Sequence, residues 1–225
     1  MILFDKISKA YNGHFALENI TLNIEQGEFV SIVGQSGAGK STLLKLLIAE
    51  EKPTSGRIFL DKQDVTALPY AELPFLRRRI GTIFQDFKLL SQKTAYENIA
   101  FAMEVVGKSK KEIQEDVPQV LQLVGLEEKA KQFPNQLSGG EQQRVAIARA
   151  LVHQPDIIIA DEPTGNLDPL NTWDVIRLLL KINELGTTIL LATHDREIIN
   201  TLNKRVVSID KGKVIRDEQN GRYIL

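Results

Sequence analysis

A glycine-rich segment between an apolar run and a helical pattern constrains this chain more than any other feature. Residues 34–41 read Gly-Gln-Ser-Gly-Ala-Gly-Lys-Ser, which fits the pattern G-x-x-x-x-G-K-[ST]. The apolar residues 29–33 directly before it predict a buried strand, and residues 41–50 predict a helix. A strand, a glycine-rich turn and a helix in this order predict a loop that binds phosphate groups.

Each part of this loop has a chemical role. Glycines let the backbone turn so that several N–H groups converge on phosphate oxygens, at the positive end of the following helix. Lys40 would bring its charge to the β- and γ-phosphates of a nucleotide, and the Ser41 hydroxyl would ligate Mg²⁺. A glycine-rich turn without a ligand is the alternative. The predicted phosphate contacts are Gly34, Gln35, Ser36, Gly37, Ala38, Gly39, Lys40, Ser41 and Thr42.

Two adjacent acids follow a second apolar run. Residues 157–160 are Ile-Ile-Ile-Ala, and Asp161 and Glu162 come next. Open α/β sheets bind ligands at the carboxyl ends of their parallel strands, where these acids would lie. Asp161 is therefore the predicted metal-side carboxylate, and Glu162 is the predicted general base that orients the attacking water. The alternative is a pair of solvated loop acids before Pro163.

His194 follows another predicted strand, so it would emerge at the same edge of the sheet. Beside a phosphate-binding loop, this position predicts a contact to the γ-phosphate. The alternative is an ordinary loop or capping residue, and Asp195 has the residue type that caps a following helix.

Two further residues are weaker candidates. Gln85 ends the predicted strand at residues 80–84, from which its amide could reach the metal or the attacking water. Tyr11 lies just after the first predicted strand, where its ring could stack on adenine. A tyrosine half buried on the sheet at a turn is an equally good interpretation of Tyr11.

A second anion-binding surface is predicted at residues 138–141, Ser-Gly-Gly-Glu. Ser138 and Glu141 have the spacing of a capping box, which is a complete structural explanation. Gly139 and Gly140 also expose backbone N–H groups beside the positive end of a helix. Unless the two surfaces are adjacent within one subunit, a two-fold head-to-tail dimer would sandwich ATP between them. The γ-phosphate would then close the dimer, and hydrolysis would reopen it.

Residues 165–168, Gly-Asn-Leu-Asp, lie just past the acidic pair. They either communicate across the dimer interface or form a turn that ends in an Asp168 cap, with Pro169 at the first helical position. The residue types favour the turn.

The alternation of apolar runs and helical patterns predicts an α/β fold with a mainly parallel sheet flanked by helices. An antiparallel sheet is predicted near the N-terminus, a helical insertion at residues 87–155, and a closing hairpin after residue 205. The predicted core strands are residues 29–33, 80–84, 156–160 and 188–193. The predicted helices are 41–50, 112–124, 140–152 and 169–184, and the outer strands are 2–8, 20–24, 206–209 and 213–216.

Composition excludes several classes of protein. The 225 residues include 28 Lys+Arg and 29 Asp+Glu, so the net charge of −1 provides no basic field for a nucleic acid. The run at residues 77–79, Arg-Arg-Arg, is predicted to be a solvated face or to make a few surface ion pairs rather than a nucleic-acid patch. Contact with acidic lipid or with a partner near the membrane is a further alternative. The chain contains no cysteine, which suits a reducing compartment such as the cytoplasm. No apolar run approaches the roughly 20 residues that span a bilayer, and the N-terminus does not resemble a signal peptide.

Together, these motifs resemble an ABC-type ATPase subunit over essentially the whole chain. The loop GQSGAGKST, Gln85, LSGGE, IIIADE, the triplet Asn-Leu-Asp at 166–168 and His194 occur in the order of that family. The resemblance implies the ABC fold, a sandwich dimer, MgATP, and Glu162 as the base. It also implies one ABC domain, in which residues 1–86 and 156–225 form the nucleotide-binding core and residues 87–155 form the α-helical signature subdomain.

Within this family, the chain is most similar to the FtsE group of bacterial cell-division ATPases, on residues 73–81, 83–90 and 138–144. That similarity implies an integral membrane partner of the FtsX type and peripheral location at the cytoplasmic side of the inner membrane. Residues Phe87, Leu89, Leu90 and 101–105 are predicted to dock the partner, although they suit subdomain core equally well. The alternatives are the ATPase of a lipoprotein-releasing or MacB-type transporter, or an ABC ATPase that acts on nucleic acid or ribosomes.

Overall fold

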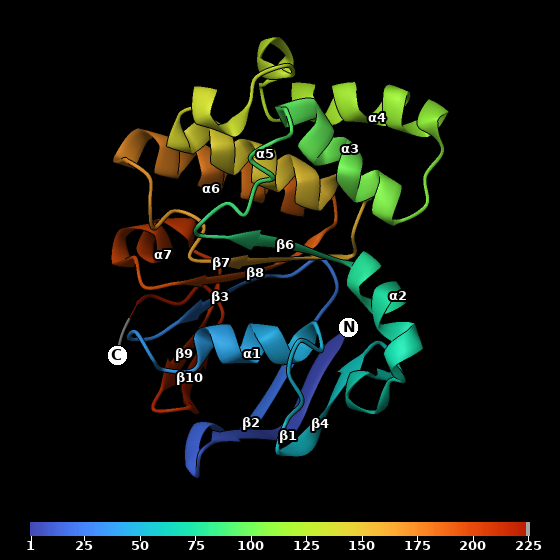
Figure 1. Ribbon diagram of the computed structural model, residues 1–225. Helices are drawn as coiled ribbons and strands as arrows, with labels where there is room; N and C mark the ends of the chain where they lie inside the picture. The colour runs from blue at the N-terminus through green and yellow to red at the C-terminus, as the bar shows by residue number, and fades with distance from the viewer. Residues whose placement is uncertain (224–225) are drawn as a thin grey trace. The chain divides into compact units, whose positions relative to one another are not determined.

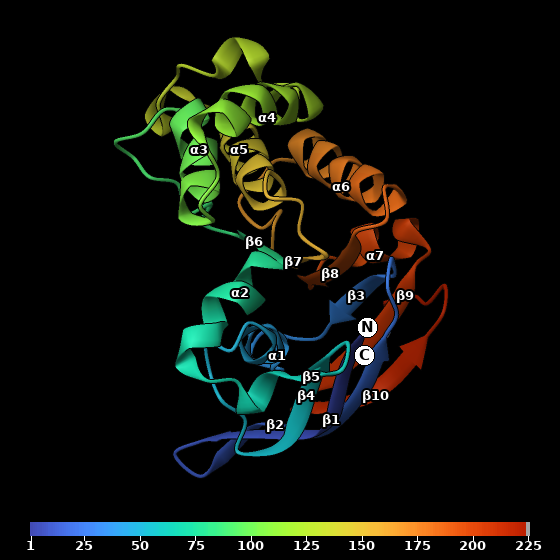
Figure 2. The same cartoon turned by 90° about the vertical axis from the view of Figure 1, so that its right-hand side faces the viewer.

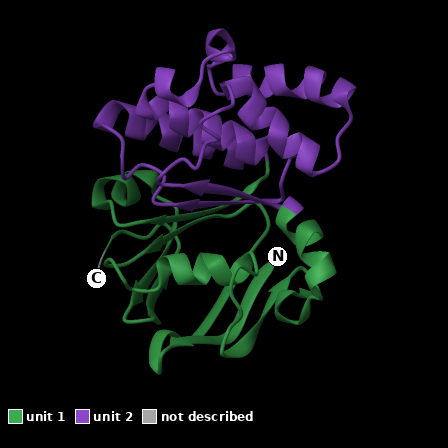
Figure 3. Ribbon diagram, in the orientation of Figure 1, with its two compact units in different colours: residues 1–77, 186–225 green, residues 78–185 purple. Residues whose placement is uncertain are grey.

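The computed structural model describes residues 1–223 and separates the chain into two compact units, which Figure 3 distinguishes by colour. The first unit contains residues 1–77 and 186–225, and the second contains residues 78–185. The second unit holds two strands and helix α6 as well as the predicted helical insertion. The predicted division at residues 87–155 stays a prediction.

The first unit begins with an antiparallel sheet in the order β2-β1-β4-β5. Its strands are β1 (Ile2–Tyr11), β2 (His14–Ile24), β4 (Ser55–Leu60) and β5 (Gln63–Asp64). Asn12 and Gly13 connect β1 to β2, and their φ angles of 49° and 82° match the turn that an Asn-Gly pair favours in a hairpin. Strand β1 therefore extends to Tyr11, three residues beyond the predicted end, because this turn closes the hairpin later.

The same unit contains a second group of strands in the order β10-β9-β3-β8. Strand β3 (Phe29–Val33) pairs in parallel with β8 (Thr188–Thr193) and β9 (Arg205–Asp210), and β10 (Lys213–Glu218) pairs with β9 in antiparallel register. Every residue of β3 and β8 is buried. This burial explains why both strands are nearly continuous apolar runs in the sequence.

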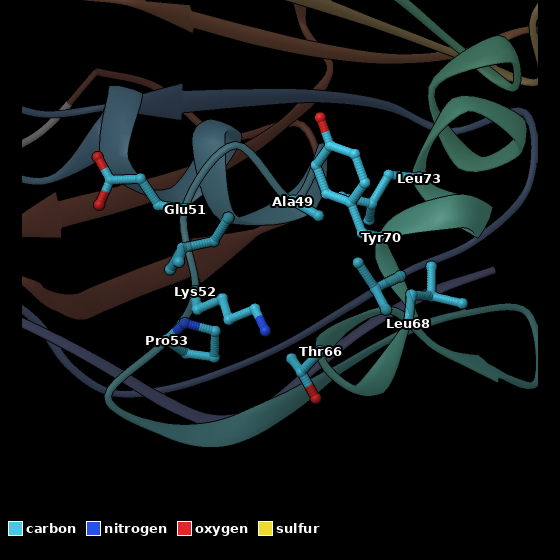
Figure 4. Close-up of a pocket in the computed structure, with 10 residues that line it drawn as sticks. Ala49, Glu51, Lys52, Pro53, Thr66, Leu68, Tyr70 and Leu73 are labelled. Atoms are coloured by element: carbon cyan, nitrogen blue, oxygen red, sulfur yellow. The ribbon is translucent and has the colours of Figure 1, made fainter.

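Helix α1 (Lys40–Leu47) lies between these two groups of strands (Figures 1 and 2). The unit also contains helices α2 (Leu73–Arg78, of which Arg78 falls in the second unit) and α7 (Arg196–Leu202). Helix α1 ends three residues before the predicted limit, because Ala49 has a left-handed φ of 50°. Beyond this end lies a small pocket of about 80 Å³ whose lining includes Ala49, Leu68, Tyr70 and Leu73 (Figure 4).

The second unit packs four helices on one side of two parallel strands (Figure 1). The strands are β6 (Ile80–Phe84) and β7 (Ile157–Asp161), and the helices are α3 (Ala95–Val105), α4 (Lys110–Leu123), α5 (Gly139–Leu151) and α6 (Pro169–Glu184). Helix α5 contacts β6 and the other three helices, so it is the centre of this unit. Its buried face carries mostly small and branched apolar residues, which allow this close packing.

The predicted fold class is confirmed, and helix 169–184 has the predicted bounds. Strand β7 is shifted by one residue and includes Asp161. Two helices and one longer strand, α2, α3 and β4, were not predicted, and α7 was expected only as the helix that Asp195 would cap. The omission of α3 is avoidable, because Thr94 and Glu97 form a complete capping box at its start.

Candidate functional site

The glycine-rich loop of the first unit connects β3 to α1, as its sequence predicts. Residues 35–37 are exposed at its tip, and Gly39 forms the N-cap of α1 with a φ of 110°. A Cβ atom at Gly39 would lie 2.5 Å from the Ala16 carbonyl oxygen, so this position needs glycine for its backbone and for space. No side chain caps this end of α1. Its N–H groups are therefore available to an anion.

Lys40 folds back over the loop that precedes it. Its Nζ atom donates hydrogen bonds to the carbonyl oxygens of Gly34 at 2.9 Å and Gln35 at 3.3 Å. The residue is only 7% exposed, so the ammonium group is held at the loop rather than in bulk water. The backbone donors and this cation form a cradle whose charge fits a phosphate group. Ser41 lies at the exposed start of α1, where its hydroxyl fits a divalent cation beside that phosphate.

His194 and the glycine-rich loop leave the sheet at the same edge. Val33 pairs with Thr193 in parallel register, so Gly34 and His194 follow at matching positions. The Asp195 carboxylate accepts hydrogen bonds from the backbone N–H groups of Glu197 and Ile198. Asp195 is therefore the N-cap of α7, and the exposed His194 lies on the side from which a phosphate would approach.

Tyr11 is the last residue of β1 and is held by two charged side chains. Its hydroxyl donates a hydrogen bond to Glu51, and the Lys9 Nζ atom lies 4.9 Å from the centre of its ring. Lys9 and Glu51 also form an ion pair of 3.0 Å. Partial burial and the hydrogen bond to Glu51 raise the pKa of the Tyr11 hydroxyl, while Tyr11 and Lys9 lower the pKa of Glu51. The ring is 40% exposed, so part of it can accept a stacked base.

The acidic pair of the second unit ends strand β7. Asp161 is the final residue of the strand, and Glu162 follows with a left-handed φ of 49°. The Gly165 N–H group donates to the Glu162 carbonyl oxygen at 3.1 Å, which closes a tight turn. Left-handed backbone is unfavourable for a residue with a Cβ atom, and such residues concentrate at functional sites. The turn fixes the backbone of Glu162 directly after the strand.

Gln85 lies at the same edge as the acidic pair. Phe84 pairs with Asp161 in parallel register, so Gln85 and Glu162 follow at matching positions. The Asn166 Nδ2 atom donates to the Gln85 carbonyl oxygen at 3.0 Å, and the Gln85 Nε2 atom donates to Asn166 Oδ1 at 3.3 Å. The structure thus brings Gln85, the acidic pair and Asn166 together, and the contact to Asn166 was not predicted.

The motif at residues 138–141 begins helix α5. The Ser138 hydroxyl accepts from the Glu141 N–H group at 3.2 Å, and the Glu141 carboxylate accepts from the Ser138 N–H group at 2.8 Å. The predicted capping box is confirmed, and its backbone hydrogen bond lowers the pKa of Glu141. A Cβ atom at Gly140 would lie 1.9 Å from the Asn171 Oδ1 atom, so a larger residue cannot fit without moving α6.

Asp168 caps helix α6, as the turn interpretation predicts. Its carboxylate accepts from the N–H groups of Leu170 and Asn171, both at 3.0 Å. Hydrogen bonds from Asn171 are the largest cause of the lowered pKa of Asp168. An atom added at Gly139 would be 3.5 Å from the Leu167 side chain, so residues 166–168 lie against the start of α5. The cap and a role at an interface are therefore compatible.

Two residues that sequence reasoning missed connect α5 to its surroundings. Arg149 donates to the carbonyl oxygens of Phe87 and Lys88, whose φ angles of 56° and 48° are both left-handed. Burial lowers the pKa of this guanidinium. Gln143 is completely buried and donates to the Pro163 carbonyl oxygen. A polar residue within the otherwise apolar face of a helix was the available signal.

The three consecutive arginines make contacts within the chain. Arg77 donates to the carbonyl oxygens of Ile48 and Ala49 at the end of α1, and Arg78 donates to that of Val105. Arg79 and Asp156 form an ion pair of 2.6 Å. The ion pair of Arg79 is of the predicted kind, whereas the contacts of Arg77 and Arg78 to backbone carbonyl groups were not predicted.

Residues 1–223 contain neither a candidate membrane span nor a cluster of metal-ligating side chains. No helix there has both the length and the apolar character needed to cross a membrane. The same residues contain no group of three or more His, Cys, Asp or Glu side chains placed to hold a metal ion.

Comparison with known proteins gives the class to which this fold and site belong. The family model for ABC transporters matches residues 17–165, which run from β2 to the turn after β7. The chain therefore belongs to the ABC transporter family and is an ATP-binding, ATP-hydrolysing subunit of the ABC type.

More specific similarity is to cell-division proteins. The cell division ATP-binding protein FtsE of Bacillus subtilis is 54% identical over 99% of this chain and 98% of its own length. The proteins of the same name from Mycobacterium tuberculosis and Escherichia coli are 51% and 47% identical, over 99% and 94% of this chain and 98% and 96% of theirs.

Solved structures of ABC cassettes have the same fold as this chain. The ATP-binding cassette MJ0796, described as a dimer in a post-hydrolysis state bound to ADP and Pi, matches with a TM-score of 0.89 and 39% identity, over 99% of this chain and 100% of that one. The cbiO1 protein of Clostridium perfringens, part of the cbiONQ transporter complex, matches with a TM-score of 0.90 and 34% identity, over 97% and 88%.

Proposed function

We propose that this chain is an FtsE-type subunit that binds MgATP between two copies of itself and drives a separate membrane protein during bacterial cell division. The proposal is supported by its near full-length similarity to FtsE proteins and by the dimeric state of the MJ0796 cassette. The observation that carries it is the presence of two glycine-containing helix starts, one in each unit, whose positive ends suit an anion. Residues 34–42 would hold one face of the triphosphate, and residues 138–141 of a second copy would hold the other.

The proposed role of each side chain follows from its chemistry and from its motif. The Glu162 carboxylate accepts a proton from the water that attacks the γ-phosphorus, and His194 contacts the γ-phosphate. Lys40 neutralises charge on the β- and γ-phosphates, and Tyr11 stacks on adenine. Ser41, Asp161 and Gln85 would hold Mg²⁺, which supplies charge neutralisation at the phosphates when bound. Hydroxyl, carboxylate and amide oxygens are the hard ligands that this cation prefers.

The assignment of Glu162 as the base predicts a specific phenotype. Glu162→Gln should slow ATP hydrolysis by about 10²- to 10⁴-fold, because the amide cannot accept the proton. ATP binding should remain intact, and a closed dimer should accumulate. Steady-state ATPase assays and size-exclusion chromatography with ATP measure the two effects. Hydrolysis at the wild-type rate would assign the base to another residue.

The membrane partner is proposed to resemble FtsX and to dock on the second unit. Phe101 and Val105 of α3 are 40% and 61% exposed, and Leu90 is 38% exposed. Met103, also predicted for this surface, is instead fully buried core, because it faces the opposite side of α3. Docking would place the chain peripherally at the cytoplasmic side of the inner membrane. The output would be control of cell-wall hydrolysis.

Copurification after mild detergent extraction tests this partner. Recovery of an integral membrane protein of the FtsX type, lost on Phe101→Asp and Val105→Asp, supports the proposal. Recovery of a transporter subunit would instead support a lipoprotein-releasing or MacB-type role, and recovery of RNA or DNA would support a role on nucleic acid or ribosomes.

A further inference from the structure

The side chain of Gln143 makes an unusual contact from inside the second unit. Gln143 lies in the second turn of α5 and is 0% exposed. Its Nε2 atom donates to the Pro163 carbonyl oxygen at 2.6 Å, while its Oε1 atom has no hydrogen-bond partner among the described residues. Burying a glutamine with half of its amide unpaired is unfavourable. An apolar side chain at position 143 would avoid this unfavourable burial, but it could not make the contact to Pro163.

The contact lies next to the proposed catalytic base. Pro163 directly follows Glu162, whose φ of 49° is left-handed. A hydrogen bond from Gly165 N–H holds the Glu162 carbonyl oxygen, and Gln143 holds the next carbonyl oxygen along the chain. The carbonyl groups of two consecutive residues, Glu162 and Pro163, are therefore each held by a hydrogen bond from a different partner. Both hydrogen bonds restrain the backbone of the turn that carries Glu162.

Helix α5 is a firm base for such a restraint. Val145, Ala146, Ile147 and Ala148 are all fully buried, so rotation of the helix would disrupt the core of the unit. The capping box at Ser138 satisfies the N-terminal end, one turn before Gln143. The start of α5 thus carries the motif at residues 138–141, and the buried face of its second turn carries the contact to Pro163.

We propose that Gln143 is a positioning residue that orients Glu162 through the Pro163 carbonyl and couples the start of α5 to the catalytic base. The proposal rests on the assignment of Glu162 as the base. Gln143 does not contact the nucleotide and takes no part in proton transfer. Its amide instead keeps the turn at residues 162–165 in the conformation that directs the carboxylate.

Gln143→Met tests the proposal, since methionine has similar length but no donor. We expect kcat to fall about 10- to 100-fold, as a displacement of a catalytic group by up to 1 Å does. The KM and the dissociation constant for ATP should stay unchanged. The melting temperature should change little, because the loss of the unpaired Oε1 atom offsets the loss of the donor to the buried Pro163 carbonyl oxygen.

Gln142→Leu is the matched control. This variant loses the hydrogen bond of 3.1 Å that the Gln142 amide donates to the Leu137 carbonyl oxygen, and it leaves the contact to Pro163 unchanged. ATPase activity within about threefold of wild type is expected, the effect of one neutral hydrogen bond. An equal loss in both variants would overturn the proposal, because general loosening of α5 would then explain it. Gln143→Leu serves if the methionine variant does not fold, and failure of both to fold would also overturn it.

A double-mutant cycle with Glu162→Gln distinguishes positioning from structure. If Gln143 acts through the Glu162 carboxylate, Gln143→Met should cause no more than about a twofold further loss in the Glu162→Gln background. The same 10- to 100-fold loss in both backgrounds would overturn the proposal. Wild-type hydrolysis by Glu162→Gln alone would refute the base assignment, whereas a slow Glu162→Gln with a fully active Gln143→Met would refute only the positioning role.

Discussion

Helices α1 and α5, whose starts are proposed to hold ATP, differ in how their first N–H groups are paired. Helix α1 begins at Gly39, a left-handed residue without a side-chain cap. Helix α5 begins at Ser138, whose capping box with Glu141 satisfies the backbone in both directions. The first end has no side-chain partner for its N–H groups, while at the second end the N–H groups of Ser138 and Glu141 are already paired within the chain.

Because of this difference, the two glycine-rich motifs are expected to contribute to ATP binding at different stages. The loop before α1 retains several N–H groups and the Lys40 cation for an anion, so it is suited to bind a nucleotide first. Helix α5 is stable beforehand and offers only the positive end of its dipole and the N–H groups near Gly139. It is suited to add affinity only when a second copy brings it to a nucleotide that is already bound.

The sharpest test compares Lys40→Ala with Ser138→Arg. Lys40→Ala should weaken ATP binding to a single subunit by about 10- to 100-fold, because a charge-assisted contact is lost. Ser138→Arg should leave that binding within about twofold, as for an exposed site. Both should reduce ATPase activity by about 100-fold or more. Equilibrium binding to dilute protein and steady-state hydrolysis measure the two quantities.

A mixture of these variants tests whether they act in different copies. A dimer of one Lys40→Ala chain and one Ser138→Arg chain contains one composite site with both defects and one intact site. Activity should therefore recover on mixing. If mixing restored no hydrolysis, the trans arrangement would be contradicted. Circular dichroism of each variant before mixing controls for misfolding.

A smaller effect is expected on stability without nucleotide. Ser138→Ala should lower the free energy of unfolding by about 1 kcal/mol, because it removes the cap of α5. Ser36→Ala in the exposed loop before α1 is the control, with an expected change within about 0.5 kcal/mol. Urea denaturation measures both. A larger effect for Ser36 would show that the loop is stabilised by its own side chains, contrary to the contrast drawn above.

The smallest expected effect is a dependence on pH. The folded state lowers the pKa of Glu141 from its ordinary value of 4.5, chiefly through the Ser138 N–H group. The carboxylate therefore contributes stability above its unfolded pKa, and this contribution is lost as the pH falls through the folded pKa. The stability difference between wild type and Glu141→Gln should shrink between about pH 6 and pH 3. The exposed Glu128→Gln serves as the control, and an equal pH dependence in it would contradict the assignment.

Much of the site was predictable, because each motif carries its own local geometry. The pattern at residues 34–41 defines a strand, a turn and a helix, and the structure has all three. The capping box at Ser138 and the Asp168 cap with Pro169 follow from residue spacing, and both are present. These features depend on residues within four positions of each other, so the sequence expresses them directly.

Contacts between distant segments were not predictable. Gln143 and Pro163 are 20 residues apart, Gln85 and Asn166 are 81 apart, and Tyr11 and Glu51 are 40 apart. Nothing in the periodicity of any one segment selects these partners. Met103 follows the core alternative that was given for the docking residues; the helix around it was not recognised, so its buried face could not be assigned from the sequence.

The sequence by itself determined the class of fold, the capped starts of α5 and α6 and the chemical groups of the phosphate loop, because these depend on short-range sterics and hydrogen bonding. Only the tertiary structure decided that Glu162 has a left-handed backbone, that Gln143 reaches the next carbonyl group, and that Asn166 holds Gln85. Such partners are selected by the packing of strands and helices, and packing depends on the whole unit at once.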